Sequence, residues 1–208
     1  MKKAYRWTDV VFIGGLWGIL EATLGYGLQF LPAWFSGSVM FPIGAAILMM
    51  AYRRHGSSRM LVYIGLVAAT IKAVNLFMPG LPPVRTYNPM IAIMLQTSLV
   101  AVVLPRLQKQ PIVESALAIV GVSIGWRILF MLNNSLNVAL TDNTIFYVMN
   151  VDNLIGFALL LGLVGAVFAI LLFEGARRMD VSRLKAMRFH PTAALGMVAI
   201  AVLLTWFL

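Results

Sequence analysis

Four ionisable side chains interrupt long apolar stretches of this sequence, and their types give them the clearest capacity for chemistry. They are Glu21, Lys72, Arg127 and Asp152. A charge at the centre of a membrane-spanning helix costs about 2.5–3.5 kcal/mol by the lower, insertion-based scales, so such a residue usually faces a partner or a polar cavity. Lysine and arginine could bind anionic groups there, whereas a carboxylate could bind an amine or carry a proton. These four residues are therefore the first candidates for a functional site.

The segments that carry these residues have the length and composition of transmembrane helices. The chain has 208 residues, 61% of them hydrophobic and 11% charged, whereas soluble domains have about 25% charged residues. Its mean hydropathy is +0.91. Apolar segments near the roughly 20 residues that a bilayer requires lie at about 9–31, 35–52, 60–78, 88–105, 112–132, 147–173 and 191–208. We predict an all-α polytopic membrane protein, a compact bundle of six transmembrane helices followed by a seventh, C-terminal helix.

The basic residues predict the topology of this bundle. If the N-terminus is cytoplasmic, thirteen of the sixteen Lys and Arg fall in inside loops: Lys2, Lys3, Arg6, Arg53, Arg54, Arg59, Arg106, Lys109, Arg177, Arg178, Arg183, Lys185 and Arg188. This distribution obeys the positive-inside rule. The net charge of +9 is thus explained by topology and does not indicate a nucleic-acid partner. We expect one transmembrane domain over 1–208 in the plasma or inner membrane, with a core at about 8–175, a basic cytoplasmic loop at 174–190 and a final helix at 191–208.

The four buried charges lie at similar depth. With a rise of about 1.5 Å per residue, Glu21, Lys72 and Arg127 lie roughly 18–22 Å from the cytoplasmic ends of their helices. Asp152 lies near the outer boundary of the sixth segment. The inner halves of the helices are almost entirely apolar. The polar residues are therefore expected in the middle and outer layers of the bundle.

Small residues share helical faces with two of these charges. Gly14, Gly18, Ala22 and Gly25 lie on the face of Glu21, and Gly65, Ala68, Ala69 and Asn75 lie on the face of Lys72. Such stripes let membrane helices pack closely, so both charges should point into the bundle. Depth and face make a Glu21–Lys72 pair and an Arg127–Asp152 pair reasonable, although nothing in the sequence requires either. The structural alternative to a functional role is that these two buried ion pairs only hold the helices in register.

Amides and aromatic residues at the same depth favour a polar cavity that opens outward. Asn88 begins the phrase NPMIAIML at the outer end of the fourth segment, and Asn153 follows Asp152. Tryptophans such as Trp17 could line the cavity, although interfacial anchoring is their common role. The predicted substrate-binding residues are Trp17, Glu21, Lys72, Asn75, Asn88, Arg127, Asp152 and Asn153.

The sequence lacks the residues that several kinds of chemistry require. The chain has no Cys, and its two His, at positions 55 and 190, both lie in basic loops, so thiol catalysis and a histidine metal site are not expected. It has no Walker motif and therefore does not hydrolyse ATP itself, and it has no HExxH motif. We expect no catalytic site, no metal and no cofactor. An intramembrane enzyme is a less favoured alternative.

Three stretches resemble the substrate-binding S components of energy-coupling factor (ECF) transporters. They are GGLWGILEATLGYG at 14–27, LPAWFSGSVMFPIG at 31–44 and LVAATIKAVNLFMPG at 66–80, within a resemblance that covers about residues 8–175. The resemblance implies six short helices and a solute cavity capped by the loop between the first two. It also implies partners, namely a transmembrane coupling subunit and two ATPases. The seventh segment is an addition to that pattern.

Together these features predict a membrane subunit that binds a small polar solute, anionic or zwitterionic and vitamin-like, for uptake. Lys72 and Arg127 would bind its anionic groups, while Glu21 and Asp152 would balance them or bind an amine. A stand-alone proton- or ion-coupled carrier, in which Glu21 or Asp152 carries the proton, is the alternative from another class. A structural or assembly subunit without any small ligand is a further one.

Overall fold

The computed structural model describes residues 5–30, 33–141, 147–180, 182 and 188–208. Its elements are α1 (Trp7–Gly27), η1 (Leu28–Phe30), α2 (Ala33–His55), α3 (Ser58–Lys72), η2 (Ala73–Phe77), α4 (Val84–Leu107), α5 (Ile112–Thr141), α6 (Val151–Asn153), the π-helix η3 (Leu154–Leu160), α7 (Leu161–Arg178) and α9 (Pro191–Phe207). Six helical spans within the described residues are long and apolar enough to cross a membrane. The predicted all-α, multi-pass bundle is confirmed, while the direction of the N-terminus stays a prediction.

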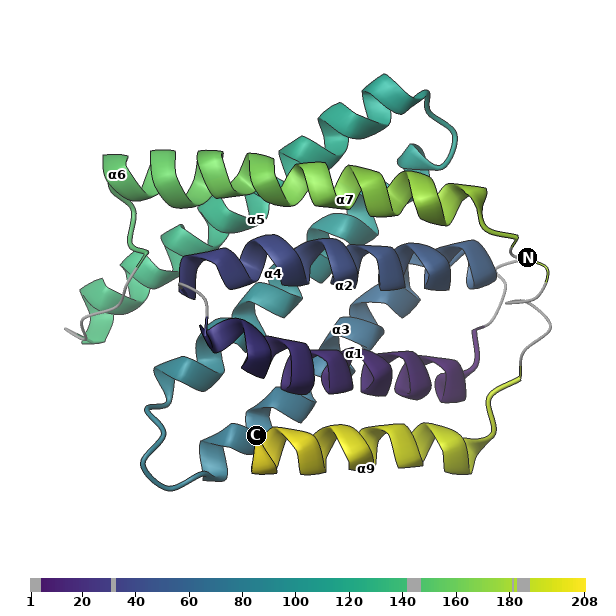
Figure 1. Ribbon diagram of the computed structural model, residues 1–208, viewed down its shortest axis with the longest axis horizontal. Coiled ribbons are helices and arrows are strands. Elements are labelled where there is room, and N and C mark those ends of the chain that lie inside the picture. Colours follow the sequence, from purple (N-terminus) through teal and green to yellow (C-terminus); the bar gives the residue numbers. More distant parts are fainter. Residues whose placement is uncertain (1–4, 31–32, 142–146, 181, 183–187) are drawn as a thin grey trace.

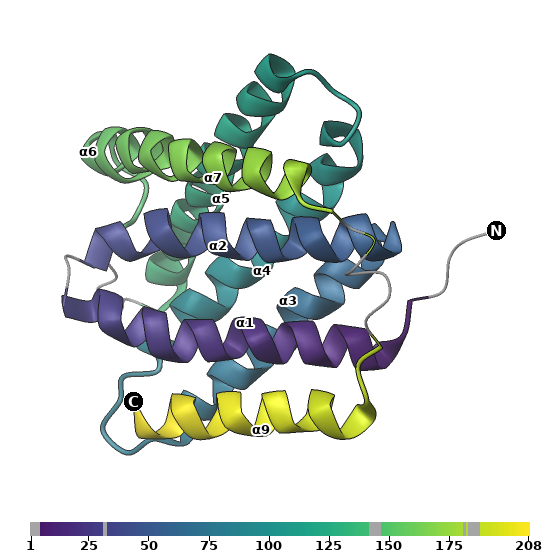
Figure 2. The same cartoon turned by 45° about the vertical axis from the view of Figure 1, so that its right-hand side comes forward.

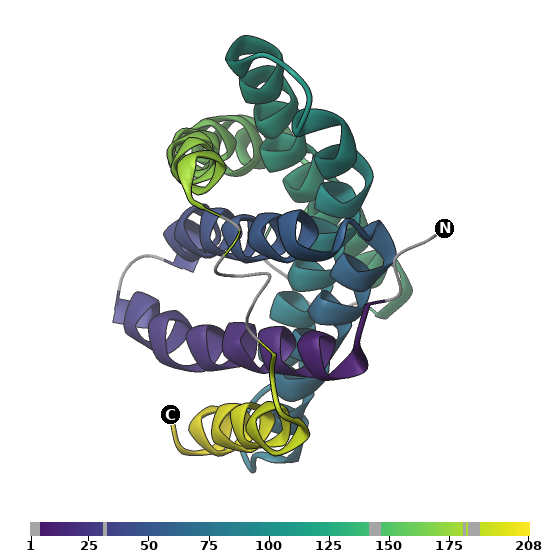
Figure 3. The ribbon, with the colours of Figure 1, turned by 90° about the vertical axis from the view of Figure 1, so that its right-hand side faces the viewer.

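The helices form two layers that cross each other. One layer contains α9, α1, α2 and the continuous α6–η3–α7 helix side by side, as Figure 3 shows most directly. The other contains α3, α4 and α5, which run obliquely behind the first (Figure 1). Contacts of α1 with α3, of α2 with α4 and of α5 with α7 join the two layers. The core is therefore the space between the layers.

Glycines on α1 allow its two neighbours to approach closely. A methyl group on Gly14 would lie 2.6 Å from Cβ of Val67 in α3, so no larger residue fits there without a shift. A methyl group on Gly15 would lie 3.0 Å from Cβ of Met197 in α9. The helix α9 runs alongside α1 in the same direction (Figure 2). Small residues on α1 thus serve the close packing that the sequence predicted, and they serve the C-terminal helix as well.

Three helix boundaries differ from the predicted ones. The fifth helix is longer than the predicted segment 112–132, because α5 continues to Thr141; residues 142–146 lie outside the described part. Residues 133–141 are rich in Asn but include neither Gly nor Pro, the residues that stop a helix most strongly. The fourth helix begins at Val84, before the segment predicted at 88–105. The third changes to a 3₁₀-helix directly after Lys72.

One end of the bundle gathers the 55–58 and 107–112 connections, the end of α7 and the start of α9, and we call it the basic end. Asp9, which is not one of the four candidate charges, provides a buried carboxylate there. Asp9 is only 1% exposed and lies 3.6 Å from Arg54 Nη2 and 3.3 Å from His55 Nε2. The guanidinium of Arg54 also lies 4.6 Å above the ring of Phe189, just before α9. This cluster ties the start of α1 to the end of α2 and to the approach to α9.

Other arginines join further helices at the basic end. Arg53 donates from Nη1 to the carbonyl of Ala176 and from Nη2 to that of Met179 at 3.1 Å. Arg177 pairs with Glu174 at 3.1 Å. Free carbonyls at a helix C-terminus carry partial negative charge, so a guanidinium placed there both satisfies and stabilises them. Arg53 therefore helps to hold the end of α7 against α2, while Arg177 reaches the carbonyl of Gln110 after α4, in addition to any role in topology.

Candidate functional site

A cavity of about 310 Å³ lies between α1, α2, α4, α5 and η3. Its polar wall contains Glu21, Ser36, Asn88 and Gln96, and its aromatic wall contains Trp126, Phe130, Tyr147 and Phe157. Gly37, Met40, Pro89, Ala92 and Ile93 complete the lining. Glu21 lies in the second half of α1, Ser36 in the first half of α2 and Asn88 in the first half of α4, which is the part of the bundle remote from the basic end. We call this part the cavity end. The volume is within the range of small-molecule sites, about 300–1,000 Å³.

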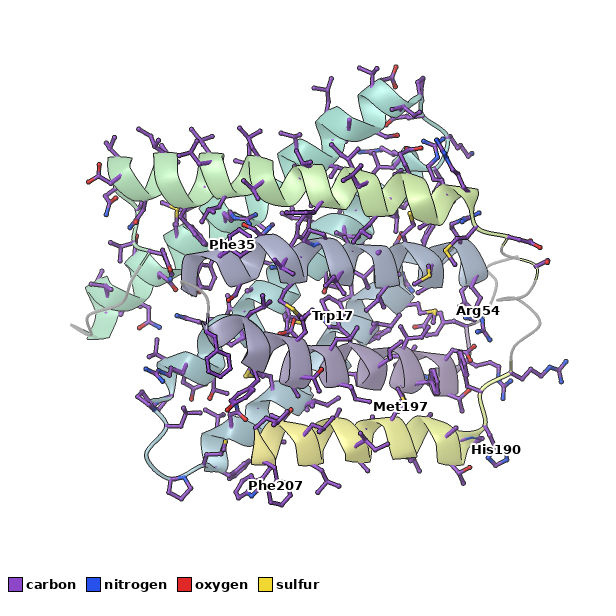
Figure 4. The ribbon with its side chains drawn as sticks, in the orientation of Figure 1. Trp17, Phe35, Arg54, His190, Met197 and Phe207 are labelled. Carbon is purple, nitrogen blue, oxygen red and sulfur yellow. The ribbon has the colours of Figure 1, made fainter. Side chains whose placement is uncertain are left out.

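Glu21 is the carboxylate of the cavity wall. Its Oε1 accepts a hydrogen bond of 3.2 Å from Nε1 of Trp17, which lies one turn earlier on α1. Trp17 is 1% exposed and lies between α1 and α2 (Figure 4). A methyl group on Gly44 of α2 would lie 2.6 Å from its indole, so the ring is closely enclosed. Trp17 thus positions Glu21 without lining the cavity itself.

Lys72 interacts with Glu21 through space but makes no contact ion pair with it. The two charges are near enough to influence each other. Within the described residues, however, no salt bridge of 4.0 Å or less joins them. Lys72 is the last residue of α3 and is partly buried outside the cavity lining. The predicted Glu21–Lys72 pair is therefore not present as a contact ion pair.

Arg127 is fully buried and tethers helices, so the structure gives it no place in the cavity lining. Its Nη1 donates to the carbonyl of Ser123 at 2.8 Å and to the Ser123 hydroxyl at 3.1 Å, and its Nη2 donates to the Ser38 hydroxyl at 3.0 Å. The two serines donate in turn to α7 carbonyls, Ser38 to Leu161 at 3.1 Å and Ser123 to Gly162 at 2.7 Å. This network connects α5, α2 and the start of α7.

Aromatic rings also compensate the Arg127 charge. The guanidinium lies 4.4 Å from the ring centre of Trp126 and 5.7 Å from that of Phe157, within the distance at which a cation is attracted to an aromatic face. Both rings line the cavity, so Arg127 lies behind the aromatic wall. A methyl group on Gly165 would lie 3.2 Å from its Nη2, and glycine at this position therefore leaves room for the guanidinium.

Asp152 does not pair with Arg127, and the suggested pair is wrong. Asp152 is exposed at the start of α6, whereas Arg127 has partners of its own and is closed off from solvent. Depth along a helix placed both residues in the same layer, but the sequence could not reveal that the Asp152 side chain points outward. Asn153 has a structural role in the same turn: its N–H bonds to Oδ1 of Asn150 at 2.7 Å and its Nδ2 to the carbonyl of Val148 at 2.9 Å.

Of the eight predicted binding residues, two line the cavity, namely Glu21 and Asn88. Asn75 is half-buried in η2, and its Oδ1 has no hydrogen-bond partner within the described part of the chain. The residues that the prediction missed are mostly apolar or small, such as Met40 and Phe157. These types are common in every membrane helix, so only their convergence in space identifies them.

Comparisons with known proteins add no relative: no family model, no curated protein and no solved structure matches this chain. The site must therefore be interpreted from its own chemistry.

Proposed function

We propose that the protein is a membrane-embedded substrate-binding subunit for the uptake of a small polar solute, resembling an ECF S component. The observation that supports it most is the cavity of about 310 Å³ with a carboxylate, two amides and a hydroxyl on one wall and aromatic rings on the other. Apolar enclosure with a few converging polar groups is typical of ligand sites. With the predicted topology, the cavity end faces the outside of the cell.

The packing of the rest of the bundle favours binding of a solute in the cavity over its free passage through the bundle. Between the cavity and the basic end, the space between the layers is filled by buried apolar side chains such as Phe41, Leu48 and Ile64. A second void there has only about 30 Å³ and an almost wholly apolar lining. Release to the inner side would then require a large rearrangement. Partner subunits that hydrolyse ATP could supply the energy for it.

The second candidate is a proton-coupled carrier, which one observation favours. Glu21 is a carboxylate within a membrane span that lines a cavity and interacts with Lys72 without a contact ion pair. Intramembrane carboxylates of this kind are typical of proton pathways. Here the chain would work alone, with Glu21 exchanging its proton with the cavity.

A gentle-detergent pull-down of the tagged protein from its native membranes, followed by mass spectrometry, tests the first proposal against the second. We expect recovery of a multi-spanning coupling subunit and paired ATPases. Recovery of the protein alone, under conditions that preserve known transporter complexes, would contradict the subunit proposal. Solute uptake by the purified protein in liposomes, driven by a pH gradient and abolished by Glu21→Gln, would then support the carrier.

A further inference from the structure

We propose that the cavity binds an organic cation that carries an aromatic ring, with its ammonium group at Glu21 and its ring against the aromatic wall. This inference rests on the proposed binding function and names the substrate class of the same site. It departs from the anionic groups expected for Lys72 and Arg127, because neither residue lines the cavity.

The charge of the cavity lining favours a cationic ligand. Glu21 is the one acidic or basic residue whose side chain contributes to the described cavity wall. Its Oε1 accepts the Trp17 hydrogen bond, whereas its Oε2 has no hydrogen-bond partner within the described residues. A carboxylate removed from water gains most from an ionised donor, and charge-assisted bonds are roughly twice as strong as neutral ones. An ammonium group therefore fits this position better than a hydroxyl or a carboxylate.

The aromatic wall of the cavity favours a ligand that carries an aromatic ring. The ring centres of Trp126, Phe130 and Phe157 lie 6.1–6.3 Å from one another, and Tyr147 stacks on Phe157 at 4.5 Å. Such a cluster offers edges and faces to a flat ring, and aromatic pairs prefer these offset and edge-to-face contacts. Nε1 of Trp126 is buried without a hydrogen-bond partner in the described part of the chain. The ring of Trp126, rather than this N–H, is therefore the part that lines the cavity.

The positions of Arg127 and Glu21 set the orientation of the ligand. Arg127 lies behind the aromatic wall, 4.4 Å from Trp126, and is held there by its serine partners. A fixed positive charge at that side disfavours an ammonium group next to it. Glu21 contributes to the polar wall from a different helix, α1. The positive end of the ligand should thus lie at Glu21, with the amides of Asn88 and Gln96 beside it.

The test measures binding of four small compounds to the purified protein in lipid nanodiscs, by calorimetry and by tryptophan fluorescence. The compounds are 2-phenylethylammonium, its neutral analogue 2-phenylethanol, the anion phenylacetate and the non-aromatic 2-cyclohexylethylammonium. We expect 2-phenylethylammonium to bind at least tenfold more tightly than the alcohol or the anion, and several-fold more tightly than the cyclohexyl compound. In Glu21→Gln its affinity should fall to that of the alcohol. In the matched control Glu114→Gln, which changes an exposed carboxylate of α5, it should not change.

The outcomes separate this inference from the proposed function. Equal or tighter binding of phenylacetate would overturn the cation assignment and leave a binding protein for anions. Absence of binding by all four compounds would also overturn it, and a broad solute screen that found no ligand would then overturn the binding function as well. If Glu21→Gln failed to fold, the ranking of the four compounds on the unaltered protein would decide alone.

Discussion

The two ends of the bundle use charge in different ways. At the basic end, the carboxylate of Asp9 contacts both Arg54 and His55, and Arg53 donates to carbonyls at the end of α7. At the cavity end, Glu21 receives one hydrogen bond from Trp17, and Lys72 stays beyond contact distance. Both ends contain partly or fully buried ionisable groups. At the basic end the charged groups pair with one another and with helix-end carbonyls, whereas at the cavity end Glu21 lines a cavity without a contact ion pair.

The contrast teaches that burial alone does not identify a functional charge in a membrane protein. Arg127 is more deeply buried than Glu21, yet its hydrogen bonds and ring contacts are all directed at its own fold. A buried charge whose partners all belong to the surrounding helices, as those of Arg127 do, stabilises structure. A carboxylate that lines a cavity, as Glu21 does, is the better candidate for binding. Four substitutions, in order of decreasing expected effect, can break or sharpen this comparison.

Asp9→Ala should have the largest effect, and the effect should be on stability. Removal of one partner from a buried ion cluster leaves uncompensated charge and costs about 3–5 kcal/mol. We expect this loss in the free energy of unfolding, measured by denaturant titration in mixed micelles. The exposed Glu114 at the same end provides the control, and Glu114→Ala should leave the transition unchanged. An unaltered transition for Asp9→Ala would show that the basic end is not held by this cluster.

Arg127→Lys should destabilise the protein more than Arg127→Met does. Lysine keeps the charge but lacks the planar fork that reaches Ser38 and Ser123 together, and lost bonds to a charged group cost about 1.5–3 kcal/mol. Methionine removes the charge and its desolvation cost together. The same unfolding titration measures both variants. If Arg127→Lys were tolerated and Arg127→Met were not, the charge itself would be required. Arg127 would then be a functional residue rather than a structural one.

Gly44→Ala should cost about 1–3 kcal/mol and weaken ligand binding at the same time. The new methyl group would lie 2.6 Å from the Trp17 indole, so the ring that positions Glu21 must move. Gly121→Ala is the matched control, because nothing lies within 4 Å of a methyl group there. Thermal unfolding and calorimetric affinity for 2-phenylethylammonium check both effects. Loss of stability with unchanged affinity would separate Trp17 from the site.

Lys72→Met should have the smallest effect, a three- to tenfold gain in affinity for 2-phenylethylammonium. Lys72 lies near Glu21, so its removal takes away a positive charge that repels an ammonium group at that carboxylate. Calorimetry at low and high salt measures the gain. The direction is decisive, because a Lys72 that bound an anionic group of the ligand would make this substitution weaken binding instead.

The general architecture could be predicted because it depends on composition and periodicity alone. Runs of apolar residues predicted the helices, and Pro191 predicted the start of α9, where His190 caps the first turn. The small-residue stripe around Gly14 predicted close helix packing. The ends of helices were less predictable: Asn133 and Asn134 suggested a loop, but α5 continues through both. Propensities are weak there compared with tertiary packing.

The site was predictable only in part, for a physical reason. Depth along a helix follows from residue number, and it correctly placed Glu21 and Asn88 at the level of the cavity. Direction around the bundle depends on the helix neighbours, and for Asp152 it differs from the expectation. The role of Ser38 as a partner of Arg127 joins residues 89 positions apart, which no local pattern can indicate.

The sequence by itself determined that this chain is a multi-pass helical bundle and that the polar residues within its spans lie mainly in one half of each span. Those properties follow from the transfer energy of each segment into a bilayer, which is nearly additive along the chain. The tertiary structure alone decided which charges find partners. Partnership requires atoms within a few ångströms, and that distance depends on how all the helices pack together. The same residue types thus became clamps at the basic end and, in Glu21, an incompletely paired group facing a cavity.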